Sequence, residues 1–378
     1  MSALAVVAAP THHGARLTVD LAAVAANTRV FAGRTHGALM AVVKADGFGH
    51  GAVDVARTAL AHGASWLGVT SLEEAFALRD AGLRAPVLSW LNAVDADFSG
   101  AIAAAVDVAV PSREHLAAVL RGGQGTRRGT RRGARVHLQL DTGMARDGAS
   151  PSDWAGLCRA ARRAERAGQL HVVGIMGHLG CADDPDDPDN RAGRARFAWG
   201  LAVARQAGLR PPLRHLAATS ATLTDPLSHH TMSRVGAGLV GIDPSRSTVL
   251  SPAMTLTAPV VGVRRVRAGT PVGYGHTWTA PRATTLALLP LGYADGLPRA
   301  AGPRAEVLLR GRRHRLVGRV SMDQVVVDVG EDAVVVGETA VVFGPGGSGE
   351  PTVAEWAAWA DTIEHEIVTG IGSRVVRA

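Results

Sequence analysis

The chain is short of lysine, of cysteine and of long hydrophobic runs. It has one lysine, Lys44, among 378 residues, so 39 of its 40 basic residues are arginine. Two cysteines, Cys158 and Cys181, provide no disulfide framework and are typical of the reducing cytosol. No run of about 18 uncharged apolar residues is present, which argues against a membrane span. The short apolar run at the N-terminus has no basic residue before it, which argues against a secretory signal. We therefore expect a cytoplasmic protein without a membrane partner.

The arginines give a formal net charge of +7, but their distribution is not that of a nucleic-acid-binding surface. They are spread along the chain, and together with the enrichment in alanine and glycine they are typical of a GC-rich genome. The one cluster is interleaved with glycine and threonine and contains no aromatic residue on which a base would stack. We interpret it as a solvated loop and expect no nucleic-acid partner. The cluster consists of Arg127, Arg128, Arg131, Arg132 and Arg135.

The scarcity of lysine makes Lys44 informative. Chemistry that needs a primary amine on a side chain, such as Schiff-base formation, has this one candidate. Lys44 directly follows the apolar run Leu39–Val43, and a lone lysine at a strand end is ordinarily one that reaches solvent. Arginine serves at every other basic position, yet it cannot form an imine. We therefore take Lys44 as a functional candidate.

Between about residues 15 and 240, short apolar runs alternate with alanine-rich helical stretches. Such alternation indicates parallel strands joined by crossover helices. Eight units in this length favour a (β/α)8 TIM-type barrel, with a doubly wound sheet as the alternative. The strand candidates are Leu39–Val43, Trp66–Val69, Pro86–Ser89, Val106–Val110, Val136–Leu140, Val172–Met176, Leu213–Ala217 and Met232–Val235.

After Asp243-Pro244 the composition changes to valine, threonine, glycine and proline, with strand-like runs at short spacing. This pattern predicts a mostly antiparallel β domain with one helix, Val353–Asp361. We predict a barrel domain over residues 12–246 and a β domain over residues 247–378, with residues 1–11 disordered or paired with the β domain. The strand candidates are Thr255–Val263, Thr284–Leu289, Val307–Leu309, Gln324–Val329 and Ala340–Phe343.

Two further motifs carry weaker signals. Residues Gly344–Gly349 fit the pattern G-x-G-x-x-G after a strand, but no βαβ unit follows, which argues against a dinucleotide site. The acidic, proline-interrupted stretch Asp183–Asp189 lies shortly after His178. We interpret it as a solvated loop, with a cation site as the alternative.

Seven blocks of sequence, all in the same order, resemble the alanine racemase family of pyridoxal 5′-phosphate (PLP) enzymes. The resemblance covers roughly residues 15–378, and several ordered motifs are far more specific than any one of them. The blocks are residues 41–51 around Lys44, Leu140–Arg146, Gly174–His178, Arg234–Gly238, Val272–Trp278, Gly292–Gly296 and Gly318–Asp323.

The resemblance implies an amino-acid racemase in which Lys44 carries PLP and acts as one acid–base group. A racemase must exchange the Cα proton on both faces of its substrate, and Tyr274 is implied as the second group. Arg146 is implied to bind the substrate carboxylate close to the tyrosine, and Asp323 to belong to the catalytic set. The other implied substrate contacts are Gln139, Tyr293 and Met322.

The family also implies how the cofactor is held. His178 lies on the cofactor, and Arg234 pairs with the pyridine nitrogen. Because arginine stays protonated, that nitrogen accepts a hydrogen bond and is not fully protonated, which weakens the electron sink. Gly236 and Ala237 offer backbone N–H groups to the phosphate. The remaining implied cofactor contacts are Thr219, Ser220 and His365.

The implied active form is a head-to-tail homodimer whose subunits share their active sites. Tyr274 and Met322 are implied to reach the site of the partner subunit, together with Asp323.

Four positions depart from the family pattern. Phe48 and His365 stand where the family places phosphate-binding tyrosines. Ala218-Thr219 replaces an Asn-Ser pair. Gln139 replaces a lysine that many members carry carbamylated, and we expect its carbonyl to accept a hydrogen bond from Arg146. These changes leave Lys44 and Tyr274 intact, but they bear on PLP affinity and substrate scope.

The leading interpretation is a racemase that interconverts L- and D-alanine for bacterial cell-wall precursors. A racemase of different or broader specificity is the first alternative, favoured by Gln139 and Phe48. A PLP decarboxylase on the same barrel is disfavoured by the tyrosine blocks at Tyr274 and Tyr293. A catalytically degraded PLP-binding relative is disfavoured by the C-terminal β domain, which carries Tyr274.

Overall fold

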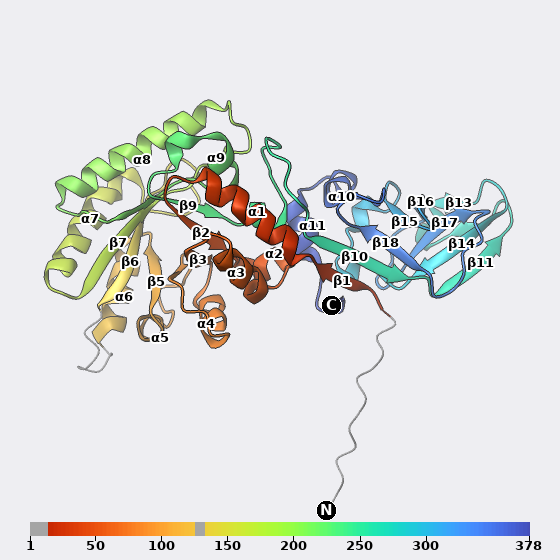
Figure 1. Cartoon of the computed structure of the whole chain (residues 1–378), viewed down its shortest axis with the longest axis horizontal. Coiled ribbons are helices and arrows are strands. Elements are labelled where there is room, and N and C mark those ends of the chain that lie inside the picture. The colour runs from red at the N-terminus through yellow and green to blue at the C-terminus, as the bar shows by residue number, and fades with distance from the viewer. Residues whose placement is uncertain (1–13, 125–132) are drawn as a thin grey trace, which may run out of the picture. The chain divides into compact units, whose positions relative to one another are not determined.

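The computed structural model describes residues 14–124 and 133–378. These residues form two compact units (Figure 1). One unit spans Leu21–Pro252, and the other combines Ala253–Ala378 with the chain segment that ends at Asp20. The N-terminal segment 1–11 and the arginines at 127, 128, 131 and 132, for which we made predictions, lie outside the described residues.

Within the part of the chain that the structure describes, the first unit is built on a parallel sheet of eight strands in the order β8-β7-β6-β5-β4-β3-β2-β9. Backbone hydrogen bonds from Thr231 N to Arg214 O (3.1 Å) and from Arg234 N to Ala217 O (3.0 Å) join the two outer strands. The sheet is therefore a nearly closed barrel, and the TIM-type prediction is confirmed. The strands are β2 (Ala38–Val42), β3 (Trp66–Val69), β4 (Val87–Ser89), β5 (Val106–Val110), β6 (Ala134–Gln139), β7 (Leu170–Met176), β8 (Leu213–His215) and β9 (Met232–Val235).

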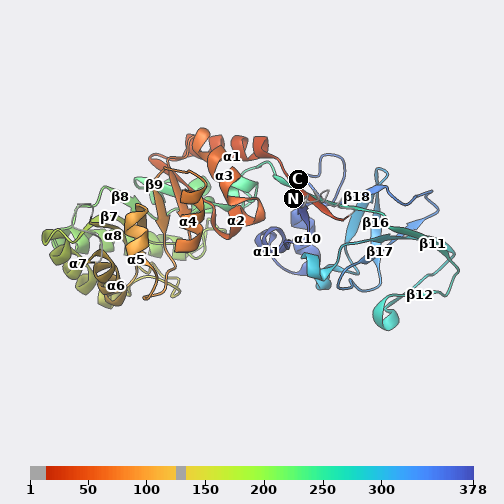
Figure 2. The same cartoon turned by 90° about the horizontal axis from the view of Figure 1, so that it is seen from below.

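Helices surround these strands (Figures 1 and 2). Helix α7 (Pro151–Arg166) shows why they form: Ser150 caps its first turn by accepting a hydrogen bond from Asp153 N, and Trp154, Leu157 and Ala161 recur at helical spacing on its buried face. The others are α1 (Leu21–Arg34), α2 (Lys44–Gly49), α3 (Ala52–Ala61), α4 (Leu72–Asp80), α5 (Phe98–Ala103), α6 (Arg113–Gln124), α8 (Pro188–Gln206) and α9 (Thr219–Thr224), with 3-10 turns η1 (Pro226–Ser228) and η2 (Ala237–Val240).

The second unit is a mostly antiparallel sheet, as predicted, with the order β11-β14-β17-β16-β15-β18-β10-β1-β19. Strand β1 (Arg16–Val19) pairs antiparallel with β10, so this segment belongs to the β unit, whereas we had placed residues 12–20 with the barrel. The remaining strands are β10 (Met254–Pro259), β11 (Gly262–Val266), β14 (Thr284–Leu289), β15 (Glu306–Leu309), β16 (Arg312–Val317), β17 (Val325–Gly330), β18 (Thr339–Phe343) and β19 (Val376–Arg377), with a ribbon of β12 (Pro271–Val272) and β13 (Trp278–Thr279).

The β unit also carries short helices. Helix α10 (Val353–Ala360) begins with a capping box in which Thr352 and Glu355 bond each other's backbone N–H. The others are α11 (Glu364–Gly370) and the 3-10 turns η3 (Tyr274–His276), η4 (Tyr293–Asp295) and η5 (Arg299–Ala301).

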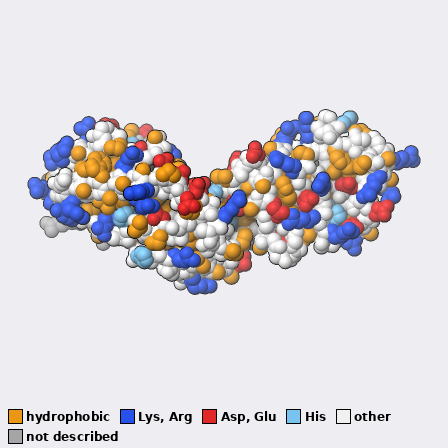
Figure 3. All heavy atoms as spheres, turned by 90° about the horizontal axis from the view of Figure 1, so that it is seen from above, with side chains coloured by type: hydrophobic (Ala, Val, Ile, Leu, Met, Phe, Trp, Pro, Cys, Tyr) orange, Lys and Arg blue, Asp and Glu red, His pale blue; other side chains and the backbone are white. Residues whose placement is uncertain are grey.

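Surface charge is mixed on the face drawn in Figure 3, where basic side chains are interspersed with acidic, hydrophobic and other groups on both units. Among the described residues, none of the helices has the length and apolar character that crossing a bilayer requires.

Candidate active site

Lys44 stands where β2 ends, at the C-terminal end of the barrel strands. The next four residues, Ala45 to Phe48, form a left-handed turn with φ between 51° and 62°. Only Gly47 adopts this backbone without strain, so each of the other three costs about 1–3 kcal/mol. Two carboxylates hold the turn: Glu74 Oε1 accepts a hydrogen bond from Ala45 N (2.7 Å), and Asp46 Oδ1 accepts one from Ala52 N (2.9 Å). The turn is therefore imposed by its surroundings and fixes the backbone beside the amine.

The electrostatic environment of Lys44 makes its amine easier to deprotonate than that of a free lysine. Burial lowers the pKa of the amine, and the Arg146 guanidinium lowers it further, while Glu74 opposes both effects. A neutral amine is the nucleophilic form, so the site activates Lys44 for attack on a carbonyl group.

Because the chain has one lysine, the amine can be titrated chemically. We expect acylation of Lys44 in the PLP-free protein to reach half its maximal rate below the pH of about 10.4 typical of a free lysine. Glu74→Gln should move this midpoint lower still, since it removes the charge that raises the pKa. Peptide mapping after timed acylation measures the rate, and the N-terminal amine serves as an internal reference. A midpoint at or above that of a free lysine contradicts the proposed activation.

Arg146 lies in the loop after β6. Asp141 Oδ1 folds this loop by accepting hydrogen bonds from the backbone N–H groups of Gly143, Met144 and Ala145 at 2.8–3.2 Å. The guanidinium is exposed, yet it depresses the pKa of both Lys44 and His178. The loop therefore places a cation beside the amine, where an anionic substrate group would be attracted.

Gln139 does not do what we expected of it. Its Nε2 donates a hydrogen bond to Asp147 Oδ2 (3.0 Å), and its buried carbonyl oxygen has no hydrogen-bond partner among the described residues. Asp147 Oδ1 in turn accepts a hydrogen bond from Gly148 N (2.8 Å). Gln139 therefore anchors the residue after Arg146 and does not accept a hydrogen bond from Arg146. Asp147 was not among the site residues predicted from the sequence.

Arg234, on β9, is a buried cation surrounded by acceptors. Its Nη1 donates to His215 Nδ1 (3.0 Å) and to His215 O (2.9 Å), and its Nη2 donates to Gly177 O (2.7 Å). Burial lowers its pKa only to about 10, so it stays protonated at neutral pH. All of these hydrogen bonds come from Nη1 and Nη2, and Nε makes none to a described residue. The Nε–H group of Arg234 is therefore left to donate to a ligand atom.

His178 follows β7 and is neutral. Burial, reinforced by Arg234, Arg146 and Lys44, lowers its pKa to about 3. Its Nδ1 lies 3.3 Å from Arg234 Nη2, and Thr142 Oγ1 fixes its backbone by accepting from His178 N (3.1 Å) and donating to His178 O (2.5 Å). The imidazole ring is therefore neutral and held in one orientation, and it lies beside the Arg234 guanidinium.

Backbone N–H groups converge at the start of η2. Gly236 N and Gly238 N both point at Thr219 Oγ1, at 3.4 and 3.3 Å. A Cβ at Gly236 would come within 2.6 Å of the Phe48 ring, and one at Gly238 within 2.2 Å of the Phe31 ring, so both positions require glycine. Ala237 lies between them, and Ser220 is buried next to Thr219. The result is a small cradle of donors of the kind that holds phosphate.

Three of the predicted residues of the β unit are exposed. Tyr274, Met322 and Tyr293 are 71%, 53% and 42% exposed. The turn of Tyr293 is tied to the loop that carries Met322, through hydrogen bonds from Tyr293 N to Ser321 O (3.0 Å) and from Ala294 N to Met322 O (2.9 Å). Large side chains as exposed as these three are suited to cover another site.

Two other predicted residues are also found in this unit. Asp323 Oδ1 accepts a hydrogen bond from Arg374 Nη1 (2.8 Å), and the same guanidinium reaches Asp295 Oδ1 (3.2 Å) in the turn of Tyr293. His365 is half-buried on α11, and its carbonyl oxygen accepts a hydrogen bond from Thr369 Oγ1 (2.6 Å). The contact of His365 with phosphate stays a prediction.

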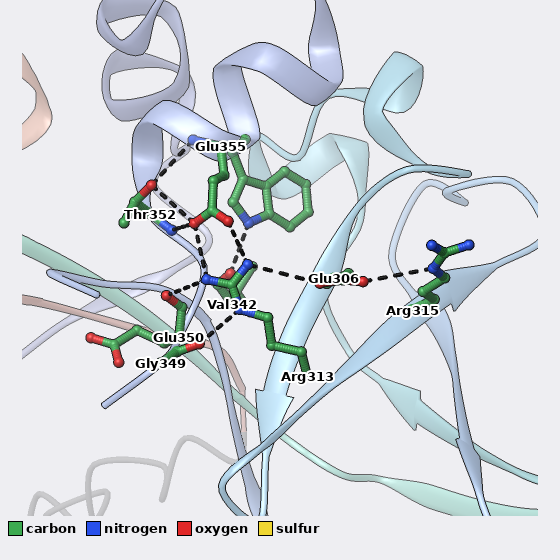
Figure 4. A network of polar contacts seen from close by, with 9 residues as sticks. Glu306, Arg313, Arg315, Val342, Gly349, Glu350, Thr352 and Glu355 are labelled. Atoms are coloured by element: carbon green, nitrogen blue, oxygen red, sulfur yellow. Dashed lines mark hydrogen bonds and ion pairs between the residues drawn. The ribbon is translucent and has the colours of Figure 1, made fainter. Parts of the chain in front are cut away.

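The glycine-rich loop after β18 already holds an anion of the chain itself. Glu350 accepts hydrogen bonds from Gly346 N and Ser348 N, both at 2.8 Å, and these bonds lower the pKa of its carboxyl although burial opposes them. Arg313 fastens the loop to α10, since it donates to Gly349 O (2.7 Å) and is paired with Glu355 (Figure 4). The N–H groups that would bind a dinucleotide phosphate are therefore used internally.

The acidic stretch caps a helix. Asp187 is the N-cap of α8 and accepts a hydrogen bond from Asp189 N (2.8 Å). The ligand atoms of these two residues and of Cys181 lie within 4.8 Å of one another. Burial and the neighbouring carboxylates raise the pKa of the Cys181 thiol, so it is not a reactive thiolate at neutral pH.

Comparison with known proteins decides the family. Residues 19–244 match the model of the alanine racemase N-terminal domain, and residues 253–378 match that of the C-terminal domain. The chain belongs to the alanine racemase family. It is 46% identical to the alanine racemase of Frankia casuarinae over 370 residues, covering 95% of this chain and 94% of that protein. It is 46% identical to the alanine racemase of Thermobifida fusca over 367 residues, covering 96% and 97%. The crystallised alanine racemase of Streptomyces coelicolor is 44% identical, with a TM-score of 0.94 over 97% of each chain. The family predicted from the sequence is thus confirmed.

The barrel residues fit the PLP that alanine racemases generally use. They provide one activated amine in Lys44, a buried cation with a free Nε–H in Arg234, and a cradle in which the N–H groups of Gly236 and Gly238 converge beside the Thr219 hydroxyl. These are the three features that an aldehyde, a pyridine nitrogen and a phosphate group require.

Several residues that hold this site were missed in the sequence. Glu74 was detectable, because Ser71 and Glu74 are spaced as a capping box at the start of a helix. Asp147 carried no such signal.

Proposed function

We propose that this protein is a PLP-dependent racemase that interconverts L- and D-alanine, and that it supplies D-alanine for peptidoglycan precursors. The observation that carries the proposal is the environment of the single lysine: its pKa is lowered by burial and Arg146, at the C-terminal end of a barrel strand. When bound, PLP would acidify the Cα–H bond of an amino acid by withdrawing electrons from it.

The side chains divide the remaining work. Lys44 Nζ would hold the cofactor and then take or return the Cα proton on one face of the substrate. Tyr274 Oη would do the same on the opposite face. The Arg146 guanidinium would bind the substrate carboxylate and so fix which face each group meets. His178, being neutral, would pack on the cofactor without adding a charge.

Arg234 and the cradle would orient the cofactor. The Nε–H of Arg234 would donate to the pyridine nitrogen and leave it unprotonated, since the pKa of Arg234 is about 10. Gly236, Ala237, Thr219 and Ser220 would hold the phosphate.

The active form we propose is a homodimer in which Tyr274, Met322 and Asp323 enter the site of the partner subunit. Their exposure supports this, because a catalytic phenol that is 71% exposed lacks the water-excluding walls that such a group needs. Arg374 would hold Asp323 in place through their 2.8 Å contact.

Circular dichroism tests the function directly. Purified protein with PLP should remove the optical activity of L-alanine and of D-alanine and approach the same endpoint from both sides. A panel of other L-amino acids should react much more slowly. Comparable rates with larger side chains would instead indicate a racemase of broader specificity, and no change with any amino acid would exclude racemisation.

The phosphate cradle makes a separate prediction. The Phe48 ring lies against Gly236, so Phe48→Tyr would place a hydroxyl on the ring carbon that already faces the cradle. A charge-assisted hydrogen bond contributes about 1.5–3 kcal/mol. On dialysis, PLP should therefore leave this variant at least about tenfold more slowly than it leaves the unsubstituted protein. Phe48→Leu, which removes the ring without adding a donor, is the matched control. Equal retention in Phe48→Tyr and the unsubstituted protein would show that residue 48 does not face the phosphate.

A further inference from the structure

A chain of buried polar side chains crosses the barrel behind Arg234. His215 Nε2 lies 2.9 Å from His137 Nδ1, and His137 Nε2 lies 3.3 Å from Asp107 Oδ2. Asp107 also accepts two hydrogen bonds from Arg135, from Nε (2.8 Å) and from Nη2 (3.1 Å). Asp107, His137 and His215 are at most 2% exposed. None of them is assigned a role in the proposed chemistry.

A glycine in strand β7 leaves room for these hydrogen-bonded side chains. His137 on β6 is paired in register with Gly174 on β7, and His215 on β8 is paired with Met176 on the same strand. A Cβ at Gly174 would lie 2.1 Å from His137 Nδ1. Only glycine therefore lets the His137 ring reach across β7 to His215.

The two ends of this hydrogen-bond chain, Arg234 and Asp107, determine the direction of every hydrogen bond in it. Arginine only donates, so His215 Nδ1 must be the acceptor of the Arg234 hydrogen bond, and the proton of the neutral His215 ring is on Nε2. His137 Nδ1 then accepts from His215, and His137 Nε2–H donates to the carboxylate of Asp107. A single tautomer of each ring satisfies all these contacts.

We propose that Asp107 is a positioning residue for Arg234: by accepting the hydrogen bond of His137 Nε2–H, it holds His215 in the tautomer that presents a lone pair to the guanidinium. The inference rests on the proposed function, in which Arg234 faces the pyridine nitrogen of the cofactor. Without the carboxylate, His137 is free to carry its proton on Nδ1, which would oppose the Nε2–H of His215. His215 would then turn an N–H toward Arg234 and release it.

The charges around these hydrogen-bonded side chains agree with a neutral His215 and an ionised Asp107. Burial lowers the pKa of His215, and the positive charge of Arg234 lowers it further, so this ring is neutral at neutral pH. Burial raises the pKa of Asp107, but the hydrogen bonds from His137 and Arg135, together with the charge of Arg135, outweigh it and keep the carboxyl ionised. Arg79 adds a further positive charge facing Asp107, and His178 faces Arg234 from the other side.

Three substitutions in the PLP-loaded protein test the proposal. Asp107→Leu removes the acceptor at similar volume, and Asp107→Asn keeps an oxygen acceptor but removes the charge. Trp66→Phe is the packing control, because the Trp66 indole packs edge-on against His137, with ring centroids 5.7 Å apart, and takes no part in the hydrogen bonds. The readouts are the imidazole N–H signals of 15N-histidine-labelled protein, the pH titration of the visible band of bound PLP, and kcat and KM for alanine.

We expect the unsubstituted protein to show His137 and His215 as two exchange-protected Nε2–H tautomers. Asp107→Leu should lose or shift both signals, displace the pH titration of the visible band, and lower kcat about tenfold or more. KM should change less than about threefold, since Arg146 is untouched. Asp107→Asn keeps an acceptor and should therefore keep both tautomers and a pH titration close to that of the unsubstituted protein, and Trp66→Phe should match the unsubstituted protein.

The proposal is overturned if the unsubstituted protein carries the His137 or the His215 proton on Nδ1, a result that decides the matter even where Asp107→Leu does not fold. It is also overturned if Trp66→Phe reproduces the changes of Asp107→Leu, because packing would then be the cause. The ring N–H signals do not depend on racemisation. A protein that shows them but does not racemise alanine would therefore refute the proposed function and not the hydrogen-bond chain.

Discussion

Lys44→Ala is expected to abolish racemisation and to leave the protein with no covalently held PLP. Lys44 is the one lysine of the chain, so no other side-chain amine can substitute for it. Loss of an acid–base group alone costs about 10²–10⁴-fold in rate, and loss of the cofactor attachment adds to this. Borohydride reduction followed by peptide mapping measures the attachment, and the optical rotation of alanine measures the activity.

The unsubstituted protein is the reference for this experiment. It should be yellow, and borohydride should fix the cofactor to a single peptide that contains Lys44. Attachment to the N-terminal amine, or a colourless protein after incubation with PLP, would exclude Lys44 as the cofactor lysine.

Tyr274→Phe is expected to stop racemisation without emptying the cofactor site. The phenol serves only one face of the substrate, so racemisation should fall by about 10²–10⁴-fold. Lys44 remains, and it should still exchange the Cα proton of the one enantiomer presented to it. NMR of L- and D-alanine in D2O measures the exchange of each enantiomer separately.

The chain offers a matched control for this variant, because it has two tyrosines. Tyr293→Phe removes the other phenol, which we assign to substrate binding, and should retain exchange from both enantiomers. Unchanged racemisation by Tyr274→Phe would remove this tyrosine from the mechanism. Loss of exchange from both enantiomers would assign it a role other than that of a one-sided base.

The barrel could be predicted because its strands are buried on both faces. Strand β5 is buried at all five positions and forms an uninterrupted apolar run apart from Asp107, and β9 is likewise wholly buried. Helix α7 has its caps and its apolar stripe in the sequence itself. Local pattern and tertiary burial therefore agree in this unit, which is the condition under which sequence reasoning succeeds.

The β unit was harder to predict, because its strands alternate between core and solvent. The sequence predicted one strand at Thr255–Val263, but the chain leaves β10 at Pro259 and begins β11 at Gly262, at another position in the sheet. Strand β16 was missed, because Arg312, Arg313 and Arg315 are all exposed and the two successive arginines at its start hide the alternation. The pairing of β1 with β10 joins residues more than 200 positions apart, which no local pattern records.

The residues of the candidate site also fall into two groups, those that the sequence predicted and those that support them. The resemblance to the family predicted Lys44, Arg146, His178 and Arg234, and Lys44 was also indicated by being the one lysine of the chain. The residues that hold these side chains in place were not predictable, since their contacts depend on which strands are neighbours. The contact of Gln139 with Asp147 is such a case, because it depends on how the loop after β6 returns to its strand.

Mixing the two inactive variants tests most directly whether Lys44 and Tyr274 act together across two subunits. Lys44→Ala and Tyr274→Phe chains, unfolded together or exchanged at equal amounts, should form half of their dimers as heterodimers. Each heterodimer would rebuild one intact site, from Lys44 of one chain and Tyr274 of the other, so about a quarter of the unsubstituted activity should return. If heterodimers are shown to form and no activity returns, the two residues do not meet across subunits, and the shared two-base site is wrong.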